Sequence, residues 1–211
     1  MTETNKLPAP STPSRDKDLA AHARHRTANL FQLLTTLTRM RIQRTREAEA
    51  RRQLSWLLDA MGALSVLQRR QGLEDAEDFS QFLAEMEAVW RRRCADRPIE
   101  LEVDAAVVAI PEQLASALSL IVNELVTNAI DHAFPGDRTG RIRIWLEAID
   151  AARARLTVAD DGVGYDPETQ SGQTLGLWLI KGLTGQLRGE LTTTTTGGVT
   201  ARLEFPTGGS G

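Results

Sequence analysis

The chain has 211 residues, which is enough for one large domain or two small ones. Hydrophobic residues make up 41% and charged residues 25%, as in ordinary globular proteins, and the net charge of −3 gives no reason to expect nucleic acid as a partner. The single cysteine, Cys94, excludes an internal disulfide and a cysteine-rich metal site, and no apolar run is long enough to predict a membrane span. We therefore expect a cytoplasmic protein.

Two long helices are predicted after a polar start. Residues 1–18 contain three prolines and no apolar core of a signal peptide, so a disordered tail is expected there. Residues 19–72 contain no proline and carry two apolar stripes at helical spacing. The stripes are Leu30, Leu33, Leu34, Leu37 and Met40, then Leu54, Leu57, Leu58, Met61, Leu64 and Leu67. A nearly all-polar stretch separates them and predicts two antiparallel helices that turn somewhere within residues 43–50.

A helical hairpin with one apolar stripe on each helix cannot bury both stripes alone. A second copy of the hairpin would complete a four-helix bundle. The sequence therefore predicts a homodimer that forms through the N-terminal helices.

The second half changes its pattern and predicts an α+β sandwich, with helices covering one face of a mixed sheet. A polar break over residues 72–78 precedes it, and residues 208–211 form an expected flexible tail. Pro111 is well placed to begin a helix, and Gly197-Gly198 is typical of a hairpin turn. The expected helices cover residues 79–90, 111–130 and 175–187, and the expected strands cover residues 99–103, 142–146, 154–158, 191–196 and 199–205.

Three short motifs follow one another in this half. Glu124 and Asn128 are four residues apart in NELVTNA, so they share a helix face, where their oxygens suit a divalent cation that bridges phosphates. Asp160 ends a buried strand in DDGVG, where a carboxylate can accept a hydrogen bond from the amine of adenine. Gly162 and Gly164 remove side chains where the ligand and the backbone must come close.

The third motif opens a helix at Leu175-Gly176-Leu177, whose amide groups favour phosphate, and residues 166–174 before it could act as a lid. Each motif has an ordinary alternative: exposed helix polars, a tight Asp-Gly turn, or a glycine at a helix start. Their order and their spacing together favour an ATP site.

These motifs resemble the N, G1 and G2 boxes of the GHKL (Bergerat-type) ATP-binding fold of histidine kinases, gyrases and related chaperones. The resemblance covers about residues 20–206 and implies a dimerisation and phosphoacceptor hairpin at 19–72 and a catalytic domain at 73–207. It implies that Glu124 and Asn128 handle Mg2+ and phosphate and that Asp160 reads adenine. The full implied ATP site is Asn123, Asn128, Asp131, Asp160, Gly162, Gly164, Thr174, Leu175, Gly176 and Leu177.

The segment His25-Arg26-Thr27-Ala28-Asn29 resembles the H-R-x-x-N phosphoacceptor of a histidine kinase subgroup related to the HWE kinases. A neutral imidazole is a good nucleophile near pH 7, and Asn29 lies on the same helix face as His25. His22 is the competing acceptor. The chain departs from the subgroup at Ala28, and no Lys or Arg lies between Gly164 and Leu175 to hold a γ-phosphate.

The resemblance implies a histidine kinase core that uses ATP and Mg2+, phosphorylates His25 and passes the phosphoryl group to a response-regulator receiver domain. A sensory domain does not fit before the first helix, so we expect the signal to come from a separate partner or from a longer chain. One alternative is a histidine phosphotransferase with a non-catalytic ATP-binding-like domain. Another is an anti-sigma-type serine kinase, which would need no hairpin with His25.

Overall fold

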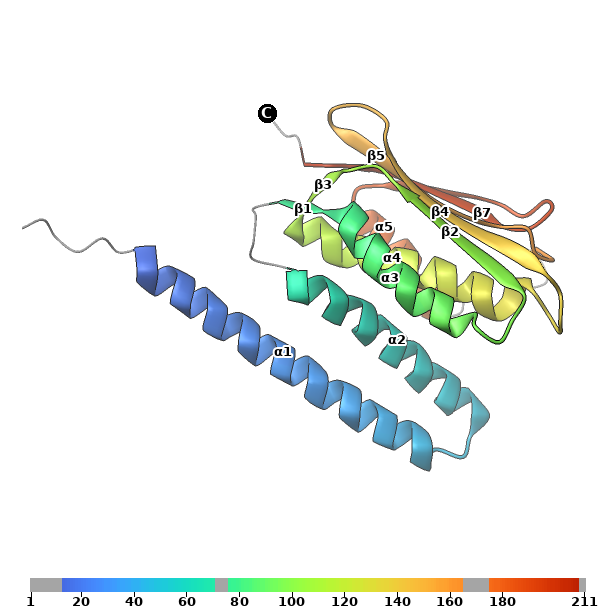
Figure 1. Ribbon diagram of the computed structural model, residues 1–211, viewed down its shortest axis with the longest axis horizontal. Helices are drawn as coiled ribbons and strands as arrows, with labels where there is room; N and C mark the ends of the chain where they lie inside the picture. Colours follow the sequence, from blue (N-terminus) through green and yellow to red (C-terminus); the bar gives the residue numbers. More distant parts are fainter. Residues whose placement is uncertain (1–12, 71–75, 165–174, 209–211) are drawn as a thin grey trace, which may run out of the picture.

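The fold has a helical hairpin on one side, a β-sheet on the other and a layer of helices between them (Figure 1). The structure is a computed structural model that describes residues 13–70, 76–164 and 175–208, with side chains from residue 26 onward except at residues 70, 76 and 77. The predicted architecture, a helical hairpin followed by an α+β sandwich, is confirmed.

The hairpin consists of α1 (Pro13–Arg44) and α2 (Ala48–Arg70), so the turn lies within the predicted interval. The end of α1 is closed by Thr45, whose hydroxyl donates to the carbonyl of Arg41 at 2.8 Å and whose amide donates to Ile42. Helix α1 begins earlier than expected, so residues 13–18 are helical rather than part of a tail. Pro13 explains the early start, because proline suits the first helical position.

The apolar stripe of α1 faces away from the rest of the chain. Leu30 is 59% exposed, and the other members of the stripe are 45–55% exposed: Leu33, Leu34, Leu37 and Met40. A contiguous apolar stripe of this kind on a helix is typical of an interaction surface.

The sheet has five strands in the order β2-β4-β5-β7-β6: β2 (Ile99–Ala105), β4 (Gly140–Ala148), β5 (Arg153–Asp160), β7 (Thr200–Pro206) and β6 (Glu190–Thr194). The β2–β4 pair is parallel and the other three pairs are antiparallel, so the sheet is mixed as predicted. Alternate residues of the central strands are buried on one face, including Ile144, Leu156 and Leu203.

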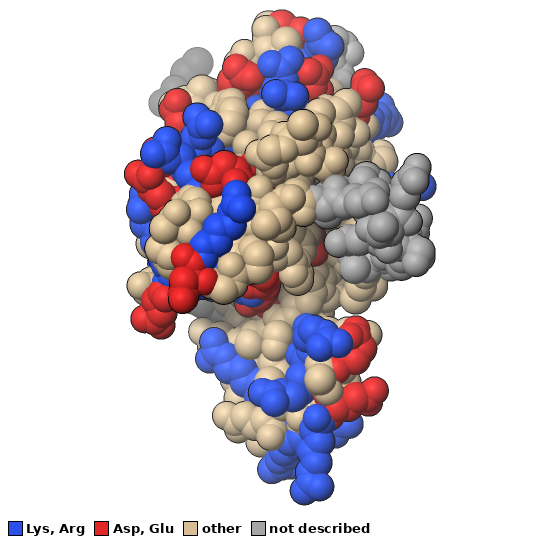
Figure 2. Space-filling model, turned by 90° about the vertical axis from the view of Figure 1, so that its right-hand side faces the viewer, with Lys and Arg blue, Asp and Glu red and all other residues tan. Residues whose placement is uncertain are grey.

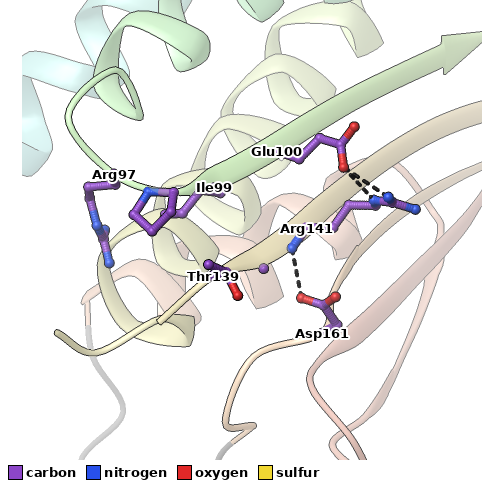
Figure 3. A pocket seen from close by; sticks show the side chains of 8 residues that line it. Arg97, Ile99, Glu100, Thr139, Arg141 and Asp161 are labelled. Atoms are coloured by element: carbon purple, nitrogen blue, oxygen red, sulfur yellow. Dashed lines mark hydrogen bonds and ion pairs between the residues drawn. The ribbon is translucent and has the colours of Figure 1, made fainter. Parts of the chain in front are cut away.

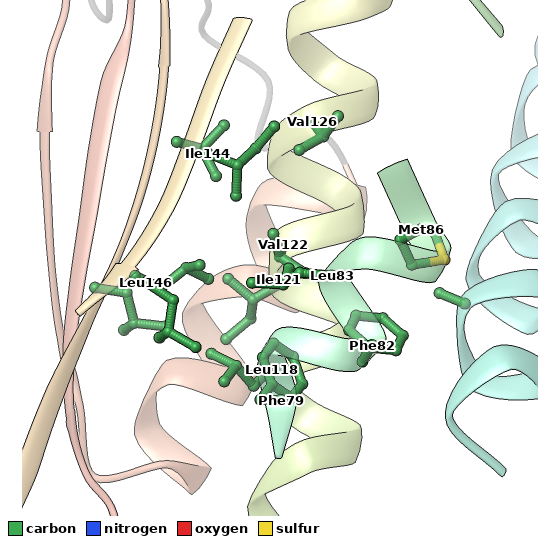
Figure 4. Packing of buried hydrophobic residues seen from close by; sticks show 14 of the residues in the cluster. Phe79, Phe82, Leu83, Met86, Leu118, Ile121, Val122, Val126, Ile144 and Leu146 are labelled. Carbon is green, nitrogen blue, oxygen red and sulfur yellow. The ribbon is translucent and has the colours of Figure 1, made fainter. Parts of the chain in front are cut away.

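Three helices cover that buried face: α3 (Phe79–Arg93), α4 (Glu112–Asn128) and α5 (Leu175–Gln186). Figure 4 shows Leu118, Ile121 and Val122 of α4 between the sheet and the side chains of α3. Helix α2 also contributes Ala63, Val66 and Leu67 to the same core. The hairpin is therefore packed onto the second half of the chain through α2.

Two three-residue strands were not predicted. Strands β1 (Ala76–Asp78) and β3 (Ala109–Pro111) form a small antiparallel pair before α3 and α4. Among the described residues, one segment, Glu112–Ala133, is long and apolar enough to cross a membrane by length and composition alone. Its apolar character is explained by its position, because α4 lies in the core between the sheet and α3.

Candidate functional site

The predicted Glu124–Asn128 pair is present on α4. The Asn128 side-chain amide donates to Glu124 Oε1 at 3.0 Å, which confirms that the two residues share a helix face. Glu124 is only 6% exposed, and burial raises the pKa of its carboxyl group, against the opposing effect of hydrogen bonds from Trp56 and Asn128. A buried carboxylate beside a carboxamide can provide two oxygen ligands for a hard cation.

The second Glu124 oxygen is occupied by a residue of the hairpin. The indole Nε1 of Trp56, on α2, donates to Glu124 Oε2 at 2.5 Å. This contact could not be predicted from local sequence patterns, because the two residues are 68 positions apart.

The start of α5 lies directly against Glu124. A Cβ added at Gly176 would overlap the Glu124 carboxylate, so a side chain there would force that carboxylate to move. Leu175 and Leu177, on either side of it, are 48% and 38% exposed. The predicted N and G2 motifs are therefore in contact, while Thr174 lies outside the described residues.

Asp160 ends β5, as predicted. Its Oδ1 accepts from the amides of Gly162 at 2.9 Å and Val199 at 3.2 Å. Burial raises the pKa of Asp160, and these two amides act in the opposite direction. With Oδ1 fixed by the backbone, the carboxylate has a defined orientation, as recognition of an adenine amine requires.

The glycines after Asp160 allow the loop to pack closely. A Cβ on Gly162 would lie 2.8 Å from the carbonyl carbon of Ala133, whose oxygen accepts from the Val163 amide at 2.9 Å. Gly164 has a φ of +66°, and a Cβ there would lie 2.7 Å from the Thr195 carbonyl oxygen. The G1-like loop is thus held against the end of the N-box helix.

That end is a π-helix, η1 (Ala129–Ala133), which carries Asp131 and His132 on its exposed side. Wide helical turns of this kind are often found at functional sites. Arg97 donates to the carbonyls of Ile130 and Phe134 and so attaches its guanidinium to this wide turn.

Asp131 accepts from Arg93 of α3 at 2.6 Å, and the same guanidinium donates to Asp59 of α2 at 2.6 Å. Asp131, which was assigned to the ATP site, therefore lies in an ion-pair bridge. Asn123 faces the interior of the domain, where its Oδ1 accepts from the indole of Trp90 at 3.1 Å. Its assignment to the ATP site remains a prediction.

Two cavities flank these residues. One, of about 500 Å³, lies at the start of β4, where Arg97, Glu100, Arg141 and Asp161 line it; Arg141 pairs with Glu100, and its amide donates to Asp161 (Figure 3). The other, of about 710 Å³, lies between the hairpin turn and Leu175 and is lined by Trp56, Leu57 and the arginines Arg41, Arg44 and Arg46. Figure 2 shows basic side chains concentrated over this turn.

The described residues contain no group of three His, Cys, Asp or Glu side chains that could hold a metal ion. A magnesium ion at Glu124 and Asn128 would therefore need phosphate oxygens or waters as further ligands, as is usual for this ion. This donor set fits a metal that arrives with a nucleotide.

The backbone of His25 lies in α1, and its side chain lies outside the described part of the chain, whereas Asn29 is exposed. Thr38 Oγ1 lies 4.0 Å from Met61 Sδ, which fixes the register of the two helices. Counted from the hairpin turn, Trp56 is level with about residue 36 of α1, and counted from the Thr38–Met61 contact it is level with about residue 43. At 1.5 Å per residue, His25 is therefore about 17–27 Å from Trp56 along the hairpin axis.

Comparisons with known proteins identify a family for the second half of the chain. Residues 113–209 match the family described as "Histidine kinase-, DNA gyrase B-, and HSP90-like ATPase". The Erythrobacter litoralis protein "Blue-light-activated histidine kinase 2" is 25% identical over 201 residues, covering 90% of this chain and 57% of that protein. "Sensor histidine kinase PdtaS" of Mycobacterium tuberculosis is 30% identical over 179 residues, covering 79% of this chain and 34% of that protein.

A solved structure agrees with the fold. The histidine kinase domain from the Erythrobacter litoralis EL346 blue-light activated histidine kinase superposes with a TM-score of 0.67 at 20% identity, covering 85% of this chain and 94% of that one. The chain spans 57% and 34% of the length of the two curated relatives. Its ATP-binding domain, within residues 113–209, belongs to the GHKL ATPase family, and the chain is similar over most of its length to histidine kinases.

Proposed function

We propose that the chain binds Mg-ATP, phosphorylates His25 and passes the phosphoryl group to an aspartate of a response-regulator receiver domain. The observation that carries the proposal is the convergence of three separate motifs. Glu124 with Asn128, Asp160 with its glycine loop, and the Gly176 helix start meet at one end of the α4–sheet layer.

In this proposal, Asp160 selects adenine, and Glu124 and Asn128 hold the metal and phosphates. The Mg2+ ion, when bound, neutralises phosphate charge. An imidazole nitrogen of His25 forms a bond to the γ-phosphorus while the bond to the departing ADP oxygen breaks. Asn29, one turn from His25, orients the ring. The receiver aspartate then takes the phosphoryl group, and the histidine returns to its starting state.

The exposed stripe of α1 supports a homodimer through residues 19–72, because a second hairpin would cover Leu33 and Leu37. The arginine-rich turn and the outer faces of the hairpin would form the receiver-docking surface. We place the protein in the cytoplasm, with its input supplied by a separate sensory partner or by a further part of a longer chain.

The test is to incubate the protein with γ-labelled ATP and Mg2+ beside His25→Ala and Asn128→Ala variants. We expect acid-labile, alkali-stable label on the wild type and none on either variant, with subsequent transfer to a receiver domain. Label that survives His25→Ala would identify another acceptor, with His22 tested next. Nucleotide binding without label would favour the histidine phosphotransferase function.

A further inference from the structure

Helix α2 makes a polar contact inside the proposed nucleotide site. Trp56 donates its indole N–H to Glu124 Oε2 at 2.5 Å, while Asn128 donates to Glu124 Oε1 at 3.0 Å. Both oxygens of a carboxylate that is 6% exposed are thus taken by groups of the chain itself. Of the two donors, only Trp56 comes from outside the N-box helix.

A second contact attaches the same face of α2, one turn further along. Asp59 pairs with one arm of the Arg93 guanidinium and Asp131 with the other, each at 2.6 Å. The three side chains are 33–44% exposed, so the bridge is accessible to water and to competing ions. Trp56 therefore holds α2 to Glu124 directly, and Asp59 holds it, through Arg93, to Asp131 of the predicted ATP site. We call these two residues and their bonds to Glu124 and Arg93 the α2 latch.

The latch fixes the site at a distance from the phosphoacceptor. Because α1 and α2 are antiparallel, His25 lies about 17–27 Å from the level of Trp56 along the hairpin axis. In a dimer with parallel hairpins, the His25 of the second copy would be equally far from Trp56 along the hairpin axis. Direct phosphoryl transfer requires reacting atoms about 3–3.5 Å apart, so the latched arrangement cannot react.

We propose that the α2 latch is a nucleotide-sensitive restraint, in which the Trp56 indole competes with bound nucleotide for Glu124. The inference rests on the proposed ATP site. In this proposal, a ligand that reaches the 6% exposed carboxylate of Glu124 displaces the indole N–H, and the Asp59–Arg93–Asp131 bridge then remains as a polar attachment of this part of α2. Ligand and open state therefore favour each other, and the apparent affinity for nucleotide is reduced by the closed fraction.

Nucleotide affinity is the first test. Trp56→Phe keeps the aromatic packing and removes the N–H, and Asp59→Asn keeps the shape and removes the charge. A fluorescent ATP analogue with Mg2+ should bind Trp56→Phe about threefold to tenfold more tightly than wild type, as expected if most molecules are closed. Asp59→Asn should tighten binding in the same direction. Trp145→Phe is the matched control, because Trp145 lies on β4 beside Arg143, and its affinity should stay at the wild-type value.

Hydrogen exchange provides the second test and does not depend on activity. With a non-hydrolysable ATP analogue, amides of residues 49–59 should exchange faster in wild type, while those near Leu67, in the core, should not change. In Trp56→Phe the same amides should exchange fast without nucleotide.

If nucleotide binds, but exchange of α2 stays constant and Trp56→Phe binds with wild-type affinity, the latch is refuted and the ATP site stands. If neither wild type nor Trp56→Phe binds nucleotide, both proposals fail. Binding by Trp56→Phe alone would support a latch that is closed in nearly every molecule.

Discussion

Two adjacent glycines in the β6–β7 turn should differ sharply in their tolerance of a methyl group. Gly197 has a φ of +72° and Gly198 a φ of +112°. A Cβ on Gly197 would meet nothing within 4 Å. A Cβ on Gly198 would overlap the carbonyl oxygen of Asp160, lying 2.8 Å from its carbonyl carbon and 3.0 Å from the Cα of Asp161. The two positions therefore separate backbone strain from steric pressure on the proposed adenine-reading residue.

The expected costs follow from these contacts. Gly197→Ala places alanine in the left-handed region at a cost of about 1–2 kcal/mol. Position 198 has backbone angles outside that region, so an alanine there brings about 1–3 kcal/mol of backbone strain. Overpacking adds about 1–3 kcal/mol, so Gly198→Ala should lose about 2–6 kcal/mol of unfolding free energy in total. The overlapping atoms belong to the backbone and cannot rotate away. The change also moves Val199, whose amide donates to Asp160 Oδ1 at 3.2 Å.

Urea unfolding and titration with a fluorescent ATP analogue would measure both effects. Gly197→Ala should lose up to about 2 kcal/mol of unfolding free energy and bind the analogue like wild type. Gly198→Ala should lose more stability and bind at least about tenfold more weakly, equivalent to about 1.4 kcal/mol. Equal stability and equal affinity for the two variants would refute the close contact between the turn and Asp160.

Three further substitutions test the site. Burial raises the pKa of Glu124 above its usual 4.5, so the folded state holds this proton more tightly than the unfolded state does. The wild type therefore loses unfolding free energy as the pH rises from the unfolded-state pKa to the raised folded-state pKa. Glu124→Gln has no proton to lose, so urea unfolding should show its stability relative to wild type increasing with pH over that range. Asp160→Asn keeps an oxygen for both backbone amides but replaces the second oxygen with a donor, so calorimetry should show weaker ATP binding with unfolding free energy within about 1 kcal/mol of wild type. Arg97→Met removes two donors to the carbonyls of Ile130 and Phe134, and urea unfolding should show a loss of about 2–4 kcal/mol, whereas an unchanged value would mean that water replaces the guanidinium.

Periodic patterns made most of the fold predictable. The two leucine stripes bracketed the hairpin turn, although neither glycine nor proline marks it; Thr45 ends α1 through its own hydroxyl. Alternation at Ile142 and Ile144 identified β4. Strands β1 and β3 escaped prediction because three residues are too few to display a period of two.

The site was predictable where its residues are local in sequence. The i, i+4 spacing placed Glu124 beside Asn128. The partner of Asn123 could not be predicted, because Trp90 belongs to another helix and the contact depends on how α3 packs on α4. The contact between Trp56 and Glu124 was equally unpredictable, because the sequence around Trp56 is typical of an ordinary apolar helix face.

Because α2 packs into the core of the second half, the hairpin and the second half should fold as one unit. Ala63, Val66 and Leu67 complete the core that contains Phe82 and Met86. A cut after residue 70 would expose this apolar surface to water and leave the remaining fragment prone to aggregation. In the intact chain, melting of α2 and melting of the sheet should be a single cooperative event, visible as one calorimetric transition. A substitution that destabilises α2 should then lower the melting temperature of the nucleotide-binding half as well.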